Sequence, residues 1–300
     1  MQKPPWPELP APAEWQPTLD TLHLWTQIAG KIRLRHMPWI NHSWGVTLYV
    51  SSRGLTTTLV PHPAGDFEIE FNFVDHRLDI RRVTGRSLSF DLKPMTVADF
   101  YRQTMDSLGQ LGITTHIYPK PAELPDPITP FPEDTIHTAY DPEMVHRYWL
   151  ALTHAHRVFT TFRARFSGKV SPVHFFWGAF DLAVTRFSGR IAPKHPGGAP
   201  NCPAWVMEEA YSHELSSAGF WPGAEVGEAA FYAYAYPEPD GFRTAIIRPE
   251  TARYHDGLGE FVLPYDAVRN ARDPDGALLS FLESTCQAAA EYGRWPAEYE

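Results

Sequence analysis

The two halves of this 300-residue chain carry the same features in the same order. In each half a helical stretch is followed by a Gly-Lys step, a proline, a Trp-Gly pair and an apolar run. A second apolar stretch and a closing helix complete each half. This repeated order predicts two related units that pack together. The shared features are Gly30-Lys31, Pro38, Trp44-Gly45 and 46–50 in the first half, and Gly168-Lys169, Pro172, Trp177-Gly178 and 179–184 in the second.

The pattern between the helices has a period of two, as expected for strands with one buried face. From Phe67 to Phe73 apolar residues alternate with polar ones. We therefore predict an α+β fold made of two tandem units, each with a helix, an antiparallel sheet and a second helix. A loop–helix insertion is predicted in the second unit. The units are predicted at 1–118, which includes an N-terminal arm, and at 141–300.

The proline-rich residues 119–140 are predicted to connect the two units. Proline has no backbone donor and keeps the preceding residue extended, so the dense proline run 119–132 is predicted to be neither helix nor central strand. After it, Asp141 is placed to cap a helix that begins at Pro142 and runs to about Phe166. The last helix is predicted to start in the same way after Asp273.

Charge and composition exclude several classes of function. The formal net charge is −9, whereas binding to a phosphate backbone requires clustered Lys and Arg. The two cysteines, Cys202 and Cys286, stand in unlike contexts and predict neither a disulfide framework nor a zinc site. No apolar stretch approaches the ~18 residues of a membrane-spanning helix, and the N-terminal residues lack the apolar core of a signal peptide. We expect a soluble cytoplasmic protein that binds neither nucleic acid nor membranes, and the sequence carries no sign of an oligomeric state.

Residues 190–228 have no counterpart in the first unit, and we predict that this insertion contributes to function. Prolines and glycines around His195 predict a loop whose backbone amides are placed to surround an anion. A helix is predicted over 203–214, which would put Glu209 and His213 on one face. That spacing suits a metal-binding or acid–base pair, and it is also explained by an ordinary solvated helix pair.

The apolar strand that leads into the insertion carries three polar residues. In a regular strand His174 and Arg186 lie on one face and Asp181 lies on the other, and a bulge at Gly178 would change this placement. Asp181 stands where the first unit has Leu48, in a run that is predicted to be interior. A carboxylate in such a place must be paired or must have a raised pKa. Asp181 is therefore either half of a structural ion pair, with Arg186 as its partner, or a site residue.

The strand that follows the insertion carries Tyr232, Tyr234 and Tyr236, which alternate with apolar residues. Aromatic side chains favour strands and pair across them, so sheet packing explains these tyrosines. They also suit the floor of a ligand pocket, because each ring offers apolar area and a hydroxyl group.

The sequence contains no phosphate-binding loop, dinucleotide fingerprint, nucleophile elbow or kinase signature. We predict a small-molecule enzyme that uses His and carboxylate groups for acid–base chemistry in an aromatic-lined cleft of the second unit, with or without a metal of unknown identity. One alternative is a non-catalytic module that binds a small ligand with the same residues. Another is an interaction protein that exposes Trp205, Phe220 and Trp221 on a flat patch. The candidate catalytic residues are His174, Asp181, Arg186, His195, His213 and Glu214, and the candidate ligand-binding residues are Asn41, His42, Trp177, Tyr211, Trp221, Tyr232 and Tyr234.

Five strings of the sequence are long and distinctive: 171–189, 195–198, 209–214, 219–223 and 231–239. On these strings, and over nearly the whole chain from Trp6 to the final helix, the sequence resembles an uncharacterised bacterial family, domain of unknown function family 5996. The resemblance implies no activity, no cofactor and no set of catalytic residues.

Overall fold

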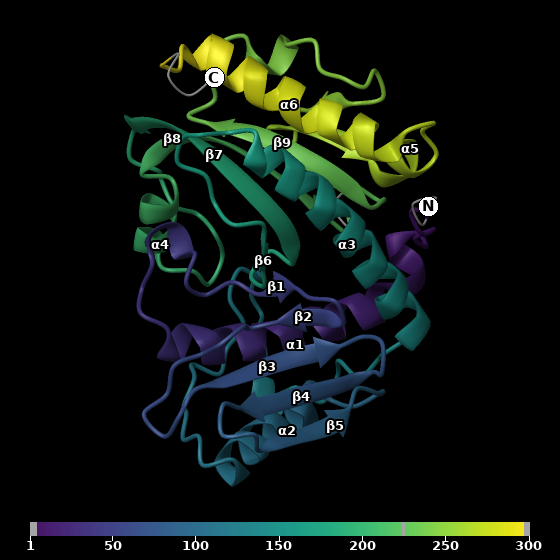
Figure 1. The fold of residues 1–300 in the computed structure, drawn as a ribbon, viewed down its shortest axis with the longest axis vertical. Coiled ribbons are helices and arrows are strands. Elements are labelled where there is room, and N and C mark those ends of the chain that lie inside the picture. Colours follow the sequence, from purple (N-terminus) through teal and green to yellow (C-terminus); the bar gives the residue numbers. More distant parts are fainter. Residues whose placement is uncertain (1–4, 224–225, 297–300) are drawn as a thin grey trace.

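The computed structural model describes residues 5–223 and 226–296. Residues 1–4 of the predicted N-terminal arm, residues 224–225 of the predicted insertion and residues 297–300 lie outside the described chain. The rest forms two antiparallel sheets with helices packed against them, which confirms the predicted α+β class (Figure 1). No helix in the described ranges has the length and apolarity needed to cross a bilayer.

The N-terminal sheet has five antiparallel strands that lie in chain order. The elements of this half are α1 (Pro12–His36), η1 (Asn41–Ser43), β1 (Tyr49–Val50), β2 (Gly54–Thr56), β3 (Phe67–Asn72), β4 (Arg77–Arg82), β5 (Ser87–Asp91) and α2 (Val97–Gln110). Trp25 of α1 stacks on Phe100 of α2 with 4.6 Å between ring centroids, and Phe100 stacks on Phe71 of β3 at 6.0 Å. The alternation predicted for β3 therefore produces the apolar face on which both helices pack.

The C-terminal sheet has six antiparallel strands in the order β10-β11-β9-β8-β7-β6. The elements of this half are η2 (Phe131–Glu133), α3 (Pro142–Ala164), β6 (His174–Phe176), β7 (Asp181–Ile191), α4 (Ala204–Ala210), β8 (His213–Trp221), β9 (Ala230–Tyr236), η3 (Phe242–Thr244), β10 (Arg253–His255), β11 (Glu260–Pro264), α5 (Tyr265–Arg269) and α6 (Pro274–Gly293).

The two faces of this sheet have different partners. One face packs against α3 and α6 (Figure 1). Its core includes Phe231, whose ring lies 6.3 Å from Phe159 of α3. The opposite face carries Tyr232, Tyr234 and Tyr236, because successive strand residues alternate between faces. We call this second side the tyrosine face. It lies on the side of the sheet where α4 and the proline-rich connector contribute side chains.

The two sheets are joined edge to edge. Leu48, just before β1, pairs with Phe175 of β6 through backbone hydrogen bonds of 2.9 and 2.7 Å. Beside this junction the Trp177 indole donates to the carbonyl oxygen of Val46 at 2.8 Å. The same indole packs on Gly30 of α1, where a Cβ atom would lie 2.2 Å from the ring. A glycine is therefore needed at this point in the helix.

The predicted helix starts are confirmed. The Asp141 side chain accepts hydrogen bonds from the backbone amides of Glu143 and Met144 at the start of α3. Asp273 accepts one from the amide of Gly276 at the start of α6. In each case a carboxylate satisfies amides that have no partner within the helix.

The predicted helix over 203–214 is wrong beyond Ala210, because α4 ends there and His213 begins strand β8. Strand β8 lies between β7 and β9 and pairs with both along most of its length. This long-range pairing outweighs the local helix signals. The excursion from the sheet is therefore shorter than the predicted insertion of 190–228.

Both halves contain a helix, an antiparallel sheet and a closing helix in that order. The two sheets differ in detail, because β1 is only Tyr49–Val50 whereas β7 runs over Asp181–Ile191. In the C-terminal sheet β11 is inserted between β9 and β10, which departs from chain order. An internal duplication stays a prediction.

Candidate functional site

A buried carboxylate on the tyrosine face is the centre of the candidate site. Asp181 is the first residue of β7 and is only 6% exposed. Its Oδ2 atom accepts a hydrogen bond from the Tyr232 hydroxyl. Its Oδ1 atom is buried and has no hydrogen-bond partner within the described chain. Buried polar atoms without partners are uncommon in native proteins, so this oxygen marks a place where a ligand or a water molecule can bind.

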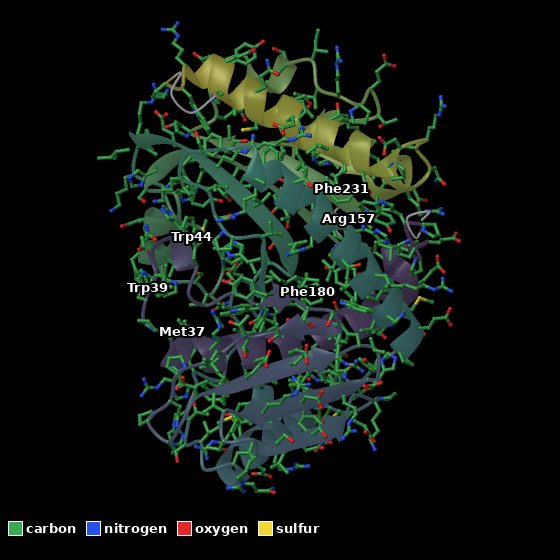
Figure 2. All side chains as sticks on the ribbon, viewed as in Figure 1. Met37, Trp39, Trp44, Arg157, Phe180 and Phe231 are labelled. Atoms are coloured by element: carbon green, nitrogen blue, oxygen red, sulfur yellow. The ribbon has the colours of Figure 1, made fainter. Side chains whose placement is uncertain are left out.

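A tight turn between β6 and β7 positions this carboxylate. Phe176 pairs with Asp181 across the hairpin, so residues 177–180 make the connection. Phe180 has a left-handed backbone with φ of 58°, which is uncommon for a bulky residue. Its ring stacks on Tyr148 of α3 at 5.7 Å, and Figure 2 shows it at the level where the two sheets meet. Core packing thus holds the turn in a conformation that the chain would otherwise avoid.

Burial and neighbouring groups shift the pKa of Asp181. Burial raises the pKa of the Asp181 carboxyl group to about 7, the hydrogen bond from Tyr232 opposes this increase, and the Glu123 carboxylate adds to it. Burial, together with the charge of Asp181, also raises the pKa of Tyr232 well above its usual value. Near neutral pH both protonation states of Asp181 are therefore populated beside a protonated tyrosine. Titratable groups perturbed in this way concentrate at functional sites.

Glu123 comes from the proline-rich connector and was not among the predicted site residues. Its backbone is left-handed, with φ of 59°. A Cβ atom on Gly178 would lie 2.0 Å from Glu123 Oε1, so this carboxylate occupies the space that the glycine leaves. The side chain is accessible to solvent, yet burial raises the pKa of its carboxyl group, an effect that Lys31 opposes. Glu123 is thus an accessible carboxylate in partly desolvated surroundings.

Gln27 of α1 holds the connector beside the site. Its side-chain amide donates to the carbonyl oxygen of Ala122 at 2.9 Å and accepts from the Ala122 amide at 2.8 Å. Gln27 is fully buried. This pair of hydrogen bonds fixes the residue that precedes Glu123.

Lys31 of α1 supplies a positive charge. Its side chain is 8% exposed, and its ammonium group lies 5.6 Å from the ring centre of Tyr118 and 5.7 Å from that of Trp177. Burial lowers the pKa of Lys31, and electrostatic attraction to Cys202 and Glu123 opposes this decrease. Over the ranges that the structure describes, the Lys31 ammonium group forms no hydrogen bond or ion pair. Its ammonium group is stabilised by the aromatic rings instead.

The predicted tyrosine ladder forms the floor next to Asp181. The rings of Tyr232 and Tyr234 stack with 6.1 Å between centroids, and the hydroxyl groups of Tyr234 and Tyr211 lie 2.8 Å apart. Trp221 contacts the Tyr232 ring edge-on at 4.8 Å. Gly219, in the next strand, leaves room for Tyr232, since a Cβ atom there would lie 2.3 Å from the Tyr232 hydroxyl oxygen. Tyr211, Tyr232 and Tyr234 are half-buried, so they remain partly accessible to solvent.

His195 lies at the outer end of this floor. Its ring stacks on Tyr211 with 4.4 Å between centroids and contacts Tyr236 at 5.0 Å. The Gly197 amide donates to His195 Nδ1 at 3.0 Å, so one of the amides predicted to surround an anion is used by the histidine itself.

Two predicted catalytic residues lie on the other face of the sheet. Arg186 pairs with Glu283 of α6 at 3.2 Å, and its guanidinium group covers the Phe162 ring of α3 at 3.4 Å. Glu214 accepts hydrogen bonds from Ser188 at 2.9 Å and from Arg190 Nε at 2.8 Å. The predicted ion pair between Asp181 and Arg186 is therefore wrong, because strand alternation separates them.

The predicted placement of His174 opposite Asp181 is also wrong. The turn at 177–180 reverses the chain, so that His174 pairs with Ala183 and lies on the same face as Asp181. The His174 ring is fully buried, and neither of its nitrogen atoms has a hydrogen-bond partner in the described part of the molecule. Burial lowers the pKa of His174 to about 3, which keeps the ring neutral.

The remaining predicted histidines lie elsewhere on the tyrosine face. His42 and His213 face each other with 5.9 Å between ring centroids, beside Lys169. Asn41 is exposed. Glu209 bonds to the Trp39 indole at 2.8 Å, so the predicted pairing of Glu209 with His213 on a helix is wrong.

The flat apolar patch required for an interaction protein is not formed by the predicted residues. Phe220 is fully buried on the helix face of the sheet, where its ring lies 4.9 Å from Phe231. Trp205 is 52% exposed but contacts Trp39 at 4.9 Å.

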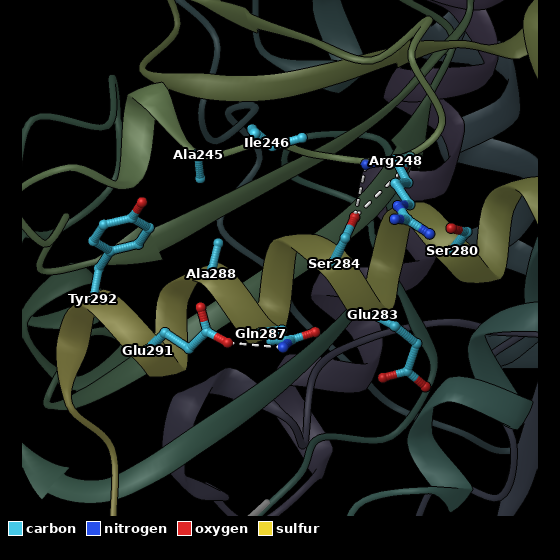
Figure 3. Close-up of a pocket in the computed structure, with 10 residues that line it drawn as sticks. All are labelled: Ala245, Ile246, Arg248, Ser280, Glu283, Ser284, Gln287, Ala288, Glu291 and Tyr292. Atoms are coloured by element: carbon cyan, nitrogen blue, oxygen red, sulfur yellow. Dashed lines mark hydrogen bonds between the residues drawn. The ribbon is translucent and has the colours of Figure 1, made fainter.

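No group of three His, Cys, Asp or Glu side chains in the described ranges is arranged to hold a metal ion. A surface hollow of about 580 Å³ lies between α6 and residues 245–248 (Figure 3). Within it, Ser284 bonds to the Arg248 backbone at 3.1 and 3.3 Å, and Gln287 donates to Glu291 at 2.8 Å. The hollow contains none of the predicted site residues.

The fold defines a two-sheet α+β protein whose second sheet carries a buried carboxylate among tyrosines. The chain belongs to the family of unknown function DUF5996, whose model matches residues 6–299. No curated protein and no solved structure matches the chain.

Proposed function

We propose that this protein binds a small molecule at the Asp181 end of the tyrosine face and acts on it by acid–base chemistry. The observation that carries the proposal is the buried, unpartnered Oδ1 atom of Asp181. A purely structural carboxylate would have both oxygen atoms satisfied, because leaving a buried polar group unpaired costs about 1–3 kcal/mol. A ligand that donates a hydrogen bond to this atom would remove that cost.

Two carboxylates in different surroundings support acid–base chemistry. Asp181 is buried with a pKa of about 7, which is suited to proton transfer near neutral pH. Glu123 is accessible, and burial raises the pKa of its carboxyl group while the charge of Lys31 opposes this increase. Pairs of titratable groups whose environments differ in this way assign the acid and base roles in many enzymes. We assign the buried acid to Asp181 and the accessible base to Glu123.

The surrounding groups indicate the kind of ligand. Tyr232 and Tyr234 provide partly accessible rings, and the Lys31 ammonium group provides a positive charge with no anionic partner within hydrogen-bond distance. A small polar molecule that stacks on an aromatic ring and presents a hydroxyl or amine to Asp181 fits these groups.

A thermal-shift screen of small polar metabolites tests this proposal. Ligands should raise the unfolding temperature of the wild-type protein and have a smaller effect on Asp181→Asn and Tyr232→Phe. The matched control is Asp106→Asn, which removes an exposed carboxylate from α2 and should respond like the wild type. Ligands that stabilise every variant equally would contradict the proposed site.

A test for conversion of the bound ligand distinguishes an enzyme from a non-catalytic binding module. Each ligand found in the screen would be incubated with the wild-type protein and followed by NMR. Conversion that disappears in Asp181→Asn and Glu123→Gln supports acid–base chemistry. Saturable binding without conversion would favour the non-catalytic alternative.

A further inference from the structure

Three nitrogen-bearing side chains meet at the far end of the tyrosine face. Lys169 precedes β6, His42 lies in η1 and His213 begins β8. Nζ of Lys169 lies 2.5 Å from Nε2 of His42, and the rings of His42 and His213 are 5.9 Å apart. Lys169 adjoins Phe187, which follows Asp181 in β7 by six residues, or roughly 20 Å of strand. This group is therefore separate from the carboxylate site.

The hydrogen bonds fix the protonation of His42. A lysine ammonium group only donates, so Nε2 of His42 accepts, and Nδ1 carries the proton that is donated to the carbonyl oxygen of Ala210 at 3.0 Å. His42 is therefore neutral. The other Nζ hydrogens of Lys169 have no partner among residues that the structure describes.

His213 is oriented by its neighbour. Its Nδ1 atom lies 3.0 Å from the Ser212 hydroxyl oxygen. Nε2 of His213 has no hydrogen bond in the described ranges, and the ring is half-buried. One nitrogen is thus held by the protein while the other stays available.

No carboxylate neutralises this group. Glu209 is near enough to act on Lys169 and His42, but its Oε2 atom accepts a hydrogen bond from the Trp39 indole (Figure 2 shows Trp39 and Trp44 beside α4). Burial lowers the pKa of Lys169, and burial together with the charge of Lys169 lowers the pKa of His213. The Lys169 ammonium group therefore forms no ion pair with a carboxylate of the described chain.

The backbone beneath the group is strained. His42 and Ser43 both have left-handed conformations, with φ of 57° and 60°. Such conformations are unfavourable for residues other than glycine, and they are concentrated at functional sites. The Ser43 hydroxyl is also buried without a hydrogen-bond partner in the described chain.

Aromatic rings form one wall of the group. The Lys169 ammonium group lies 4.9 Å from the ring centre of Phe187 and 5.7 Å from that of Trp44. The attraction between a cation and a ring holds the charge in place without using its donors. Lys169 is half-buried, so its ammonium group remains within reach of a ligand.

We propose that Lys169, His42 and His213 form a binding site for an oxyanion, the phosphate or carboxylate group of a small ligand. The anion would accept from the free donors of Lys169 and from Nε2 of a protonated His213, and its charge would offset the repulsion between these two cations. The titratable groups that face this position are Lys169, His42, His213 and Glu209. Binding should strengthen as the pH falls, because a bound anion favours the protonated form of His213.

The site is tested by titrating the protein with inorganic phosphate and, separately, with acetate. Binding is followed through the NMR signals of the histidine rings. The signals of His42 and His213 are assigned with the variants His42→Gln and His213→Gln. We expect a saturable change in both signals with at least one anion, and a higher pKa for His213 when the anion is bound. The anion that binds more tightly identifies the ligand group as phosphate or carboxylate.

The comparison of two lysine variants separates a specific site from a general effect of charge. Lys169→Met should weaken anion binding at least about tenfold, which corresponds to about 1.4 kcal/mol. Lys194→Met removes an exposed lysine that pairs with Glu208 at 2.9 Å, and it should leave binding unchanged. Should Lys169→Met fail to fold, His213→Gln serves in its place and should also weaken binding. The proposal is overturned if neither anion gives a saturable change, or if the two lysine variants respond alike.

Discussion

The hydroxyl group of Tyr232 donates a hydrogen bond to one oxygen atom of Asp181 and leaves the other oxygen buried without a partner in the described chain. The two residues lie on strands β7 and β9, with Gly219 of β8 between them. The lack of a side chain at Gly219 lets the tyrosine reach across the intervening strand. This arrangement keeps a carboxylate in the interior and leaves it only half satisfied.

Removing the tyrosine hydroxyl should raise the pKa of Asp181 above its value of about 7, because the hydrogen bond from Tyr232 stabilises the ionised form. The measurement is the carboxyl carbon chemical shift of Asp181 as a function of pH in Tyr232→Phe. The control is Tyr236→Phe, whose hydroxyl donates to the carbonyl oxygen of Pro193 instead. An unchanged pKa in Tyr232→Phe would show that the hydrogen bond does not form in solution.

Asp181 should make the wild-type protein less stable as the pH rises from about 4 to about 7. The folded state binds the Asp181 proton more tightly than the unfolded state does, since the pKa is about 7 when folded and 3.8 in the reference state. At about 1.36 kcal/mol per pKa unit, the full effect is at most about 4 kcal/mol. The stability of Asp181→Asn relative to wild type should therefore increase across this range and level off above pH 7.

Urea unfolding at several pH values between these limits measures this change. The exposed control Asp106→Asn should follow the wild-type curve. A stability difference between Asp181→Asn and wild type that is constant with pH would mean that Asp181 is ionised normally in the folded protein.

Gly178→Ala should displace the Glu123 carboxylate, because the added Cβ atom would lie 2.0 Å from Oε1. Moving this negative charge away should lower the pKa of Asp181, which Glu123 helps to raise. The control is Gly109→Ala in α2, where a Cβ atom meets nothing within 4 Å. Equal Asp181 titration curves for the two variants would place Glu123 too far away to interact.

Gln27→Ala should loosen the connector beside the site. Two hydrogen bonds between the buried Gln27 side chain and Ala122 are lost, and the unpaired backbone groups should cost about 1–3 kcal/mol of the free energy of unfolding. Hydrogen exchange of residues 119–126 should become faster than in the wild type. Gln287→Ala, at an exposed position of α6, serves as the control and should leave this segment protected.

The sequence predicted the features that depend on local chemistry. Asp141 and Asp273 cap helices because a carboxylate next to a proline satisfies the first amides wherever the helix packs. The alternation of β3 and β9 follows from one face being buried. Asp181 was recognised because a carboxylate in an apolar run always requires an explanation.

Features that depend on distant pairing were missed. The first two residues of strand β8, His213 and Glu214, were predicted to end a helix, because only the position of β8 between β7 and β9 makes them part of a strand. Glu123 acts on Asp181 from the connector, and Lys31 acts on Glu123 from the first helix. No spacing in the sequence links these three residues. Proline density near Glu123 indicated a linker, whereas its left-handed backbone is visible only in three dimensions.

The pairing of Leu48 with Phe175 has a consequence for how the chain can be divided. Each sheet uses the other to cover one of its open edges, and an uncovered edge strand invites pairing with foreign chains. Fragments cut at the proline-rich connector would each expose such an edge, and the C-terminal fragment would also lose the surface on which Trp177 rests. We therefore expect that neither half folds stably when it is expressed alone. For the same reason, evolution is not expected to have recombined the halves as separate modules.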